Sequence, residues 1–168
     1  LHQRVQMSAA EVISFLESKG MKLAFAESLT GGLLCSGFVN VAGASKVVLG
    51  SVVAYQTELK SSALGVSSEL LAKVGAVDPE VALKMAEGIR SRFALQMLLD
   101  TDQVIGVSTT GVAGPDTQDG KPVGLVYVAI SGPKGERVFE EQIAGDRAEI
   151  RAGAVELAVQ HLREYLGL

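Results

Sequence analysis

The chain of 168 residues contains one cysteine, Cys35, no tryptophan and only two histidines. A single cysteine excludes an internal disulfide and fits a reducing compartment, so we expect a cytoplasmic protein. Charged residues interrupt every apolar segment well before the length of about 18 residues that a membrane span needs, and the first seven residues lack the apolar stretch of a signal peptide. The net charge of −4 and the absence of a basic run argue against a nucleic-acid partner.

The scarcity of histidine and cysteine also limits the chemistry. His2 lies in a terminal segment, residues 1–7, that we expect to be frayed, and His161 lies in the expected last helix. Neither is placed to act as the base of a histidine-dependent serine hydrolase, and together with Cys35 they form no zinc-ligand pattern, so we expect no metal. The G-x-S-x-G elbow and the G-x-x-x-x-G-K-[ST] phosphate loop are absent as well.

Small apolar residues are abundant instead. Hydrophobic residues make up 48% of the chain and glycine occurs 19 times, whereas aromatic residues make up only 5%. This composition is typical of helices that lie closely on a sheet. The length corresponds to a single domain, residues 1–168, with one sizeable core.

Strand and helix patterns alternate along the chain. Capping residues, once followed by proline, predict helix starts at Ser8, Thr57, Ser67, Asp78 and Asp146. Runs rich in β-branched and apolar residues predict strands over residues 23–26, 46–55, 104–109, 125–130 and 137–143, the last two as a hairpin. This order predicts an α/β fold with a mixed, mostly parallel sheet and helices on both faces.

Ligands in such sheets bind where loops leave the C-terminal ends of parallel strands, which selects the segments after Ala26, Ala54 and Thr109. The first segment reads as a strand, a tight turn around Ser28 and a helix start. Free N–H groups and the positive end of the helix dipole there suit an anion, or a nucleophile whose reaction creates an oxyanion. The alternative that Ser28 or Thr30 only caps the helix is also open.

A nucleophilic Ser28 needs a base other than histidine. Tyr55 and Lys60 leave the second strand together, at the sheet end where ligands bind. Burial and a nearby helix N-terminus would lower the pKa of Lys60, and a neutral lysine can accept the serine proton. The alternative is that Lys60 is a solvated surface residue and that Tyr55 packs at the strand end.

Two further segments are candidates for ligand contacts. The long loop over residues 110–122 joins two strands, and such loops are often functional. Arg147 and Arg151 lie one turn apart at a helix start and could share a phosphate, although Arg147 could equally point to solvent. Glu27, beside Ser28, is either a turn residue or a partner for a cationic substrate.

Six ordered motifs together resemble one family. They are residues 26–32 (AESLTGG), 55–60 (YQTELK), 75–77 (GAV), 85–88 (MAEG), 110–115 (TGVAGP) and 145–147 (GDR). The chain is similar, over roughly residues 8–168, to the C-terminal domain of the competence/damage-inducible CinA proteins, a family that includes stand-alone nicotinamide-mononucleotide amidases. The larger CinA proteins carry a further N-terminal domain, for which this chain is too short.

The resemblance implies a three-layer α/β/α fold with a five-stranded sheet. It also implies an amidohydrolase that converts nicotinamide mononucleotide to nicotinate mononucleotide and ammonia, with a serine nucleophile and lysine and tyrosine partners that match Ser28, Lys60 and Tyr55. We expect the oxyanion to be held by N–H groups near Gly31 and Gly32. The expected substrate contacts are Glu27, Thr30, Gly31, Gly32, Thr110, Gly111, Ala113, Gly114, Arg147 and Arg151.

The expected partner is a small nucleotide substrate, with no cofactor and with association into a homo-oligomer, a dimer. Several positions depart from the common family pattern: Leu29, Gln56-Thr57, the loop over residues 115–120 and the linker over residues 93–102. These departures concern loop contacts more than catalysis. Two alternatives are a nucleotide-binding or interaction domain without turnover, linked to competence or DNA damage, and an amidase for another small amide.

Overall fold

Helices and strands alternate along residues 2–168, the part of the chain that the computed structural model describes. In chain order the elements are α1 (His2–Lys19), β1 (Lys22–Glu27), α2 (Leu33–Val39), η1 (Ala44–Lys46), β2 (Val48–Val53), α3 (Thr57–Ser62), α4 (Ser68–Val74), α5 (Pro79–Gln96), η2 (Thr101–Gln103), β3 (Val104–Gly111), β4 (Leu125–Gly132), β5 (Gly135–Gln142) and α6 (Arg147–Leu166).

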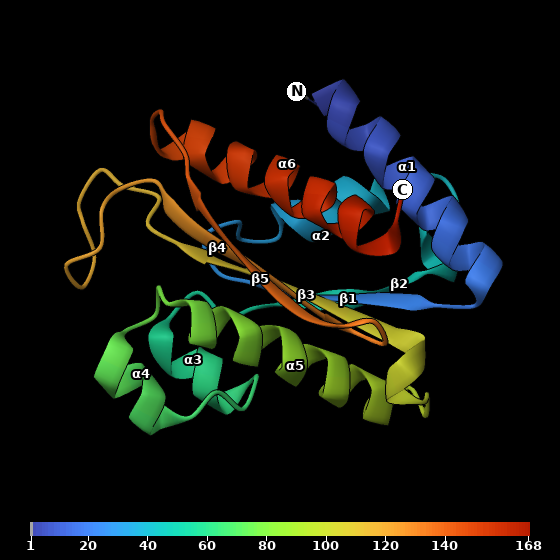
Figure 1. Cartoon of the computed structure of the whole chain (residues 1–168), viewed down its shortest axis with the longest axis horizontal. Coiled ribbons are helices and arrows are strands. Elements are labelled where there is room, and N and C mark those ends of the chain that lie inside the picture. The colour runs from blue at the N-terminus through green and yellow to red at the C-terminus, as the bar shows by residue number, and fades with distance from the viewer. Residues whose placement is uncertain (1) are drawn as a thin grey trace.

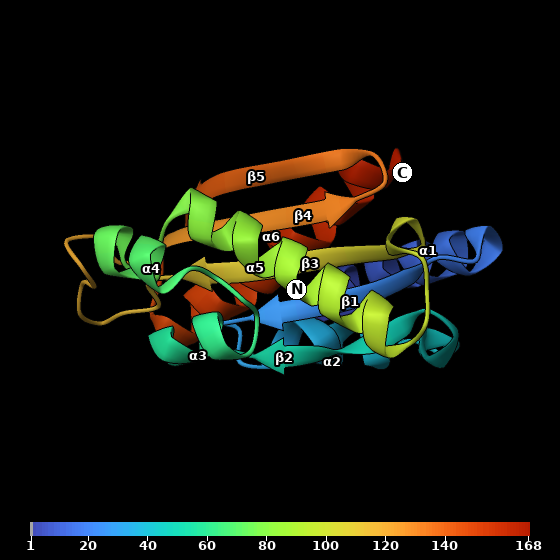
Figure 2. The ribbon, with the colours of Figure 1, turned by 90° about the horizontal axis from the view of Figure 1, so that it is seen from below.

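The five strands form one sheet in the order β2-β1-β3-β4-β5. Strand β1 pairs in parallel with β2 and β3, and β4 pairs antiparallel with β3 and β5, so four strands share one direction and β4 opposes them (Figure 2). The expected mixed, mostly parallel sheet is therefore confirmed. Because β1 lies between β2 and β3, its C-terminal end is a topological switch point, where ligands bind in open α/β sheets.

Helices cover both faces of the sheet, which confirms the three-layer α/β/α architecture (Figure 1). Helices α1, α2 and α6 lie on one face and α3, α4 and α5 on the other. The alternation along β1 explains the two cores: Phe25 points to the α1–α2–α6 side and packs on Phe38, whereas Ala24 and Ala26 point to the α5 side. These small side chains leave room for α5 to lie close to the sheet.

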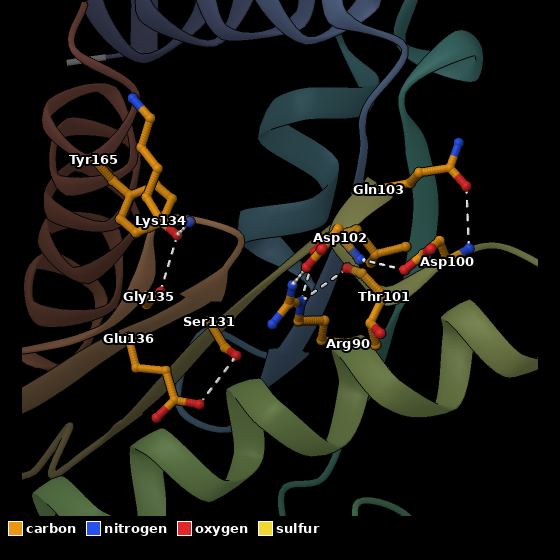
Figure 3. Close-up of polar contacts among 11 residues, drawn as sticks. Arg90, Asp100, Thr101, Asp102, Gln103, Ser131, Lys134, Gly135, Glu136 and Tyr165 are labelled. Atoms are coloured by element: carbon orange, nitrogen blue, oxygen red, sulfur yellow. Dashed lines mark hydrogen bonds and ion pairs between the residues drawn. The ribbon is translucent and has the colours of Figure 1, made fainter.

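Polar contacts fix the end of the sheet where β3 begins (Figure 3). Arg90 of α5 donates from Nε to the carbonyl oxygens of Thr101 (3.1 Å) and Val104 (2.8 Å). The Tyr165 hydroxyl donates to the Gly135 carbonyl and accepts from the Lys134 N–H, both at 2.9 Å, which holds the β4–β5 hairpin against α6. The opposite end of the parallel strands, where β1 and β3 finish, carries the long loops.

Of the five predicted helix starts, three are confirmed and two differ, and the strand ends differ from the predicted ones by up to two residues. Ser67, Asp78 and Asp146 cap α4, α5 and α6 through their side chains. Helix α1 begins at His2 and includes Ser8 as an interior residue; of the segment expected to be frayed, only residue 1 lies outside the described residues. Helix α3 has Gln56 at its N-cap with no side-chain cap, so Thr57 is its first helical residue. No helix within residues 2–168 combines the length and apolar character needed to cross a membrane.

Candidate active site

A cavity of about 460 Å³ lies at the switch point, beyond the C-terminal ends of β1, β2 and β3. All three segments that the sequence selected contribute to it, so the predicted ligand-binding segments share one cavity. The residues that line it are Ser28, Leu29, Tyr55, Gln56, Thr57, Lys60, Ala76, Val77, residues 110–118 and Arg147.

Ser28 stands at the start of two successive tight turns. Its N–H donates to the Thr109 carbonyl (3.1 Å), and its own carbonyl accepts from the Gly31 N–H (3.1 Å), which closes the first turn. The second turn is closed by the Leu33 N–H and the Thr30 carbonyl (2.9 Å). Gly31 and Gly32 have φ values of 57° and 103°, a conformation that favours glycine, and α2 starts directly after them.

Glu27 has a different environment from the one expected. Its side chain is fully buried and does not line the cavity. Its two oxygens accept hydrogen bonds from the Thr30 and Ser51 hydroxyls and from the N–H groups of Gly32, Leu34 and Cys35. The carboxylate therefore caps the first turn of α2 and ties it to β2, and the positive end of this helix dipole faces Glu27 instead of Ser28.

The expected oxyanion site at Gly31 and Gly32 is corrected by these contacts. The Gly31 N–H is used by the Ser28 carbonyl and the Gly32 N–H by Glu27 (3.1 Å), so neither is free for a ligand. The N–H of Leu29, the residue after Ser28, makes no hydrogen bond to any residue within 2–168, and Leu29 lines the cavity. The Thr30 N–H also has no partner among the described residues, but Thr30 is buried and does not line the cavity, so we take the Leu29 N–H as the donor for an oxyanion.

Lys60 reaches Ser28 inside the cavity wall. Its Nζ donates to Ser28 Oγ (2.9 Å) and to the carbonyl oxygens of Ala54 (2.7 Å) and Tyr55 (3.4 Å). The side chain is 0% exposed. Burial lowers the pKa of Lys60 from 10.5 to about 8, and the nearby Glu58 opposes this shift. The expected decrease is confirmed, and its main cause is burial.

The position of Lys60 depends on close packing between α3 and α5. The Lys60 carbonyl accepts from the Val66 N–H (3.0 Å), so the segment after α3 folds back on it. The Leu64 carbonyl lies directly against Gly88 of α5, at a place where a Cβ atom on residue 88 would overlap with it. Glycine at this position lets the chain around Lys60 approach α5 and the sheet.

Tyr55 and Arg147 contact each other at the cavity wall. Tyr55 is 55% exposed, and its hydroxyl accepts from Arg147 Nη2 (2.8 Å). Arg147 Nη1 donates to the Gly114 carbonyl, so Arg147 joins the loop after β2 to the loop after β3. Within the described structure, the hydrogen bond between Tyr55 and Lys60 uses the main-chain carbonyl of Tyr55, and the Tyr55 hydroxyl is directed to Arg147.

Arg151 does not share the environment of Arg147. Its Nε donates to the Leu29 carbonyl (2.8 Å) and its Nη2 to the Thr30 carbonyl (3.3 Å), and it does not line the cavity. The expectation that both arginines share one ligand is not met by this geometry. Thr30 is likewise buried, with its hydroxyl between Glu27 and Thr109 (2.8 Å each).

The end of β3 and the loop after it form part of the cavity wall and are anchored to residues 76–77, which precede α5. Thr110 Oγ1 donates to the Ala76 carbonyl and Lys121 Nζ to the Val77 carbonyl, both at 2.7 Å. Thr110, Gly111, Ala113 and Gly114 all line the cavity, as expected. Ten lining residues were not among the expected site residues: Leu29, Gln56, Thr57, Ala76, Val77, Val112, Pro115, Asp116, Thr117 and Gln118. Ala76 and Val77 lie in the motif at residues 75–77, and this motif was the sequence signal that could have identified them as site residues.

No group of three or more metal-ligating side chains is found within residues 2–168. His161 stacks on Phe139 of β5 with ring centroids 3.8 Å apart, and its Nε2 lies 2.8 Å from Glu141. It is thus a packed residue of α6 and is absent from the cavity lining.

Comparison with known proteins relates the sequence of this chain to one family. The model of the CinA C-terminal domain matches residues 5–166. A CinA-like protein from Frankia casuarinae is 43% identical over 155 residues, which is 92% of this chain and 34% of the relative, and one from Kosmotoga olearia is 43% identical over 157 residues, 92% of this chain and 36% of the relative. The chain spans about a third of the length of these curated relatives.

Solved structures give the same result. The crystal structure of a competence/damage inducible protein from Agrobacterium tumefaciens superimposes with a TM-score of 0.85 at 33% identity, covering 95% of this chain and 93% of that one. A CinA superfamily protein from Escherichia coli gives a TM-score of 0.85 at 28% identity, covering 94% of this chain and 88% of that one. The match spans the sheet, both helix layers and the cavity, and the chain belongs to the CinA C-terminal domain family.

Proposed function

We propose that this chain hydrolyses the carboxamide of nicotinamide mononucleotide, giving nicotinate mononucleotide and ammonia, with Ser28 as nucleophile and Lys60 as base. The observation that carries the proposal is the 2.9 Å contact between Lys60 Nζ and Ser28 Oγ in the wall of a cavity at the switch point. A buried lysine bonded to a serine beside a free backbone N–H is an arrangement for acyl transfer. Membership of a family that includes such amidases supports the choice of substrate.

The lowered pKa of Lys60 makes it a usable base. With a pKa of about 8, roughly a tenth of Lys60 is neutral at pH 7, against about 0.03% for a lysine with its ordinary value. A neutral amine has two N–H groups and one lone pair. The carbonyls of Ala54 and Tyr55 can accept the two N–H groups, which directs the lone pair to the Ser28 hydroxyl.

In the first half-reaction, Ser28 Oγ attacks the carboxamide carbon while its proton moves to Lys60. The negative charge on the carbonyl oxygen is met by the Leu29 N–H, a donor type whose loss commonly costs about 10²–10³-fold in rate. The C–N bond then breaks, the leaving nitrogen takes the proton from Lys60, and ammonia departs. This leaves a nicotinoyl ester on Ser28.

In the second half-reaction, water attacks the ester carbon and gives a proton to Lys60. The Ser28–carbon bond breaks, and Lys60 returns this proton to Ser28 Oγ, which restores the starting state. The same lysine thus moves one proton in each direction per half-reaction, and the reaction needs no cofactor.

The cavity suits a small charged nucleotide. Its volume of about 460 Å³ lies within the range of roughly 300–1,000 Å³ that is usual for small-molecule sites. Arg147 uses two of its donors on Gly114 and Tyr55, and a guanidinium has five, so others are available for a phosphate. We assign the phosphate to Arg147 because it is the arginine that lines the cavity.

Ammonia release by the purified chain tests the proposal. The substrates are nicotinamide mononucleotide, nicotinamide riboside, free nicotinamide and simple aliphatic amides. We expect the mononucleotide to be hydrolysed with the highest kcat/KM, and Ser28→Ala to lose turnover while it retains the fold and binds the mononucleotide. Turnover of another amide alone would identify a different amidase. Mononucleotide binding without ammonia release would favour a binding domain, and wild-type turnover by Ser28→Ala would exclude Ser28 as the nucleophile.

A further inference from the structure

Arg151 of α6 lies against the turn that carries Ser28. Its half-buried guanidinium donates from Nε to the Leu29 carbonyl (2.8 Å) and from Nη2 to the Thr30 carbonyl (3.3 Å). A Cβ atom at Gly31 would lie 3.1 Å from Nη2, so the guanidinium also packs on the main chain of that residue. Within residues 2–168 Arg151 forms no ion pair, and the main chain of the turn receives these hydrogen bonds instead.

A second charged side chain holds the same turn. The buried carboxylate of Glu27 accepts from the Thr30 hydroxyl (2.8 Å) and from the Gly32 N–H (3.1 Å). Arg151 therefore fixes carbonyl groups of the turn, while Glu27 fixes donors. The peptide between Leu29 and Thr30 is bonded through its oxygen to Arg151 alone within the described residues.

We propose that Arg151 is a positioning residue for the reaction of Ser28, an inference that rests on the function proposed above. A peptide group is planar and trans, so its C=O and N–H point in opposite directions. Through the Thr30 carbonyl, Arg151 orients the peptide that carries the Gly31 N–H. That N–H holds the Ser28 carbonyl (3.1 Å), which belongs to the same peptide as the Leu29 N–H, so Arg151 acts on the oxyanion donor through one intervening hydrogen bond. A charge-assisted hydrogen bond to a carbonyl also polarises its amide, which strengthens the N–H as a donor.

If this proposal is correct, Arg151 affects kcat, whereas Arg147 affects KM for the phosphorylated substrate. Arg151→Ala should lower kcat by up to about 10²-fold, because a misplacement of about 1 Å at a reacting group can have this effect, and KM should change little. The decrease should be the same for nicotinamide mononucleotide and nicotinamide riboside. Arg147→Ala should instead raise KM for the mononucleotide more than for the riboside. An increase in KM for the mononucleotide alone in Arg151→Ala would make Arg151 a phosphate ligand and overturn the proposal.

A control on the same helix separates positioning from general stability. Arg163 donates from Nη2 to Glu11 (2.7 Å), away from the cavity, so Arg163→Ala should lower Tm and leave kcat unchanged. Added guanidinium at millimolar concentration, below denaturing levels, should restore part of the kcat of Arg151→Ala and should not affect Arg163→Ala. Wild-type kcat in folded Arg151→Ala would contradict the proposal.

A third readout does not depend on the proposed substrate. A fluorophosphonate probe phosphonylates nucleophilic serines with loss of fluoride, and its phosphoryl oxygen, which gains negative charge as the serine attacks, lies where the oxyanion would be. Intact mass spectrometry follows its rate at Ser28, and we expect labelling of Arg151→Ala to be at least about tenfold slower than that of the wild type and of Arg163→Ala. If the wild type hydrolyses no nicotinamide compound, the amidase proposal fails, and this rate still decides the role of Arg151. Equal labelling rates would refute that role.

Discussion

The nitrogen of Lys60 is surrounded by three oxygen atoms although its side chain is fully buried. A charged ammonium donates to all three, whereas a neutral amine donates to the two carbonyls and accepts from Ser28. The carbonyls of Ala54 and Tyr55 therefore hold the nitrogen in the same place in both states. A proton can move between Lys60 and Ser28 without a rearrangement of either residue.

Substitution by arginine tests whether Lys60 acts as a base. Lys60→Arg keeps a positive charge, but guanidinium does not deprotonate in proteins. We expect Lys60→Arg to lose about 10²–10⁴-fold in kcat, as much as Lys60→Met, because both lack a base. Lys73→Arg, at an exposed position on α4, is the matched control and should behave as the wild type. Substantial activity in Lys60→Arg would show that Lys60 contributes only its positive charge and is not the base.

At the residue scale, the sequence predicted which residues lie near the cavity better than it predicted the hydrogen bonds that their side chains make. Ser28, Lys60 and Arg147 follow strand ends or start a helix, and they do line the cavity. Glu27 and Arg151 were expected to bind substrate, and both hold the Ser28 turn instead. The partner of Arg151 could not be inferred locally, since Arg151 lies 122 residues from Leu29 in the chain. Most partners of Glu27 are within eight residues, but their use depends on the burial of its side chain, which the local sequence does not give.

At the element scale, the contact between α3 and α5 places the base. Gly88→Ala should shift α3, because the added Cβ would overlap with the Leu64 carbonyl, a main-chain atom that cannot move alone. Alanine favours a helix over glycine by about 1 kcal/mol, so steric strain must exceed this gain for stability to decrease. We expect a lower Tm and a lower kcat, measured by thermal unfolding and ammonia release.

Gly37→Ala in α2 is the control for this substitution. A Cβ atom there would make ordinary contacts, at 3.6 Å to Val5 and 3.9 Å to Val155. Its Tm should be unchanged or higher, and its activity should be unchanged. If Gly88→Ala behaves in the same way, close packing of α3 on α5 does not determine the position of Lys60.

The two helix boundaries that the sequence missed have tertiary causes. The pattern at Ser8 and Glu11 predicts a helix start, yet α1 begins at His2 because Val5 packs against the core and Arg4 pairs with Glu156 of α6 (3.3 Å). Thr57 has the side chain of a cap, but the turn after β2 places Gln56 at that position. Local signals located the other caps because their partners are three residues away or fewer.

At the scale of the whole molecule, the burial of Lys60 reduces stability. A folded-state pKa of about 8 against an ordinary value of 10.5 corresponds to a penalty on the order of 3 kcal/mol at pH 7. Between these two values the unfolded chain binds more protons than the folded one, so this penalty shrinks as the pH rises and is absent above the unfolded value.

Lys60→Met should therefore be more stable than the wild type at pH 7, although it retains only residual activity. The difference in the free energy of unfolding between the two proteins should decrease as the pH rises from about 8 toward 10.5. Denaturant titrations of both proteins at several pH values measure this difference. Other titrating groups are the same in the two proteins, so their effects cancel when one free energy is subtracted from the other. A variant that is less stable than the wild type throughout would show that packing around Lys60 outweighs its desolvation.

The layered α/β architecture and the five strands followed from the alternation of patterns, and the family resemblance implied the same five-stranded sheet in a three-layer α/β/α fold. The strand order β2-β1-β3-β4-β5 did not follow, because it is set by which helices cross which face. It is nevertheless this order that brings the ends of β1, β2 and β3 around one cavity and places Ser28 against Lys60.

The pH dependence of kcat/KM for ammonia release from nicotinamide mononucleotide tests the Ser28–Lys60 pair most directly. The base must be neutral in the free enzyme, so kcat/KM should rise with pH and level off above an apparent pKa of about 8, the value that burial gives Lys60. This limb should be absent from the residual activity of Lys60→Met. No ammonia release, or an unchanged limb in that variant, would contradict a mechanism in which Lys60 activates Ser28.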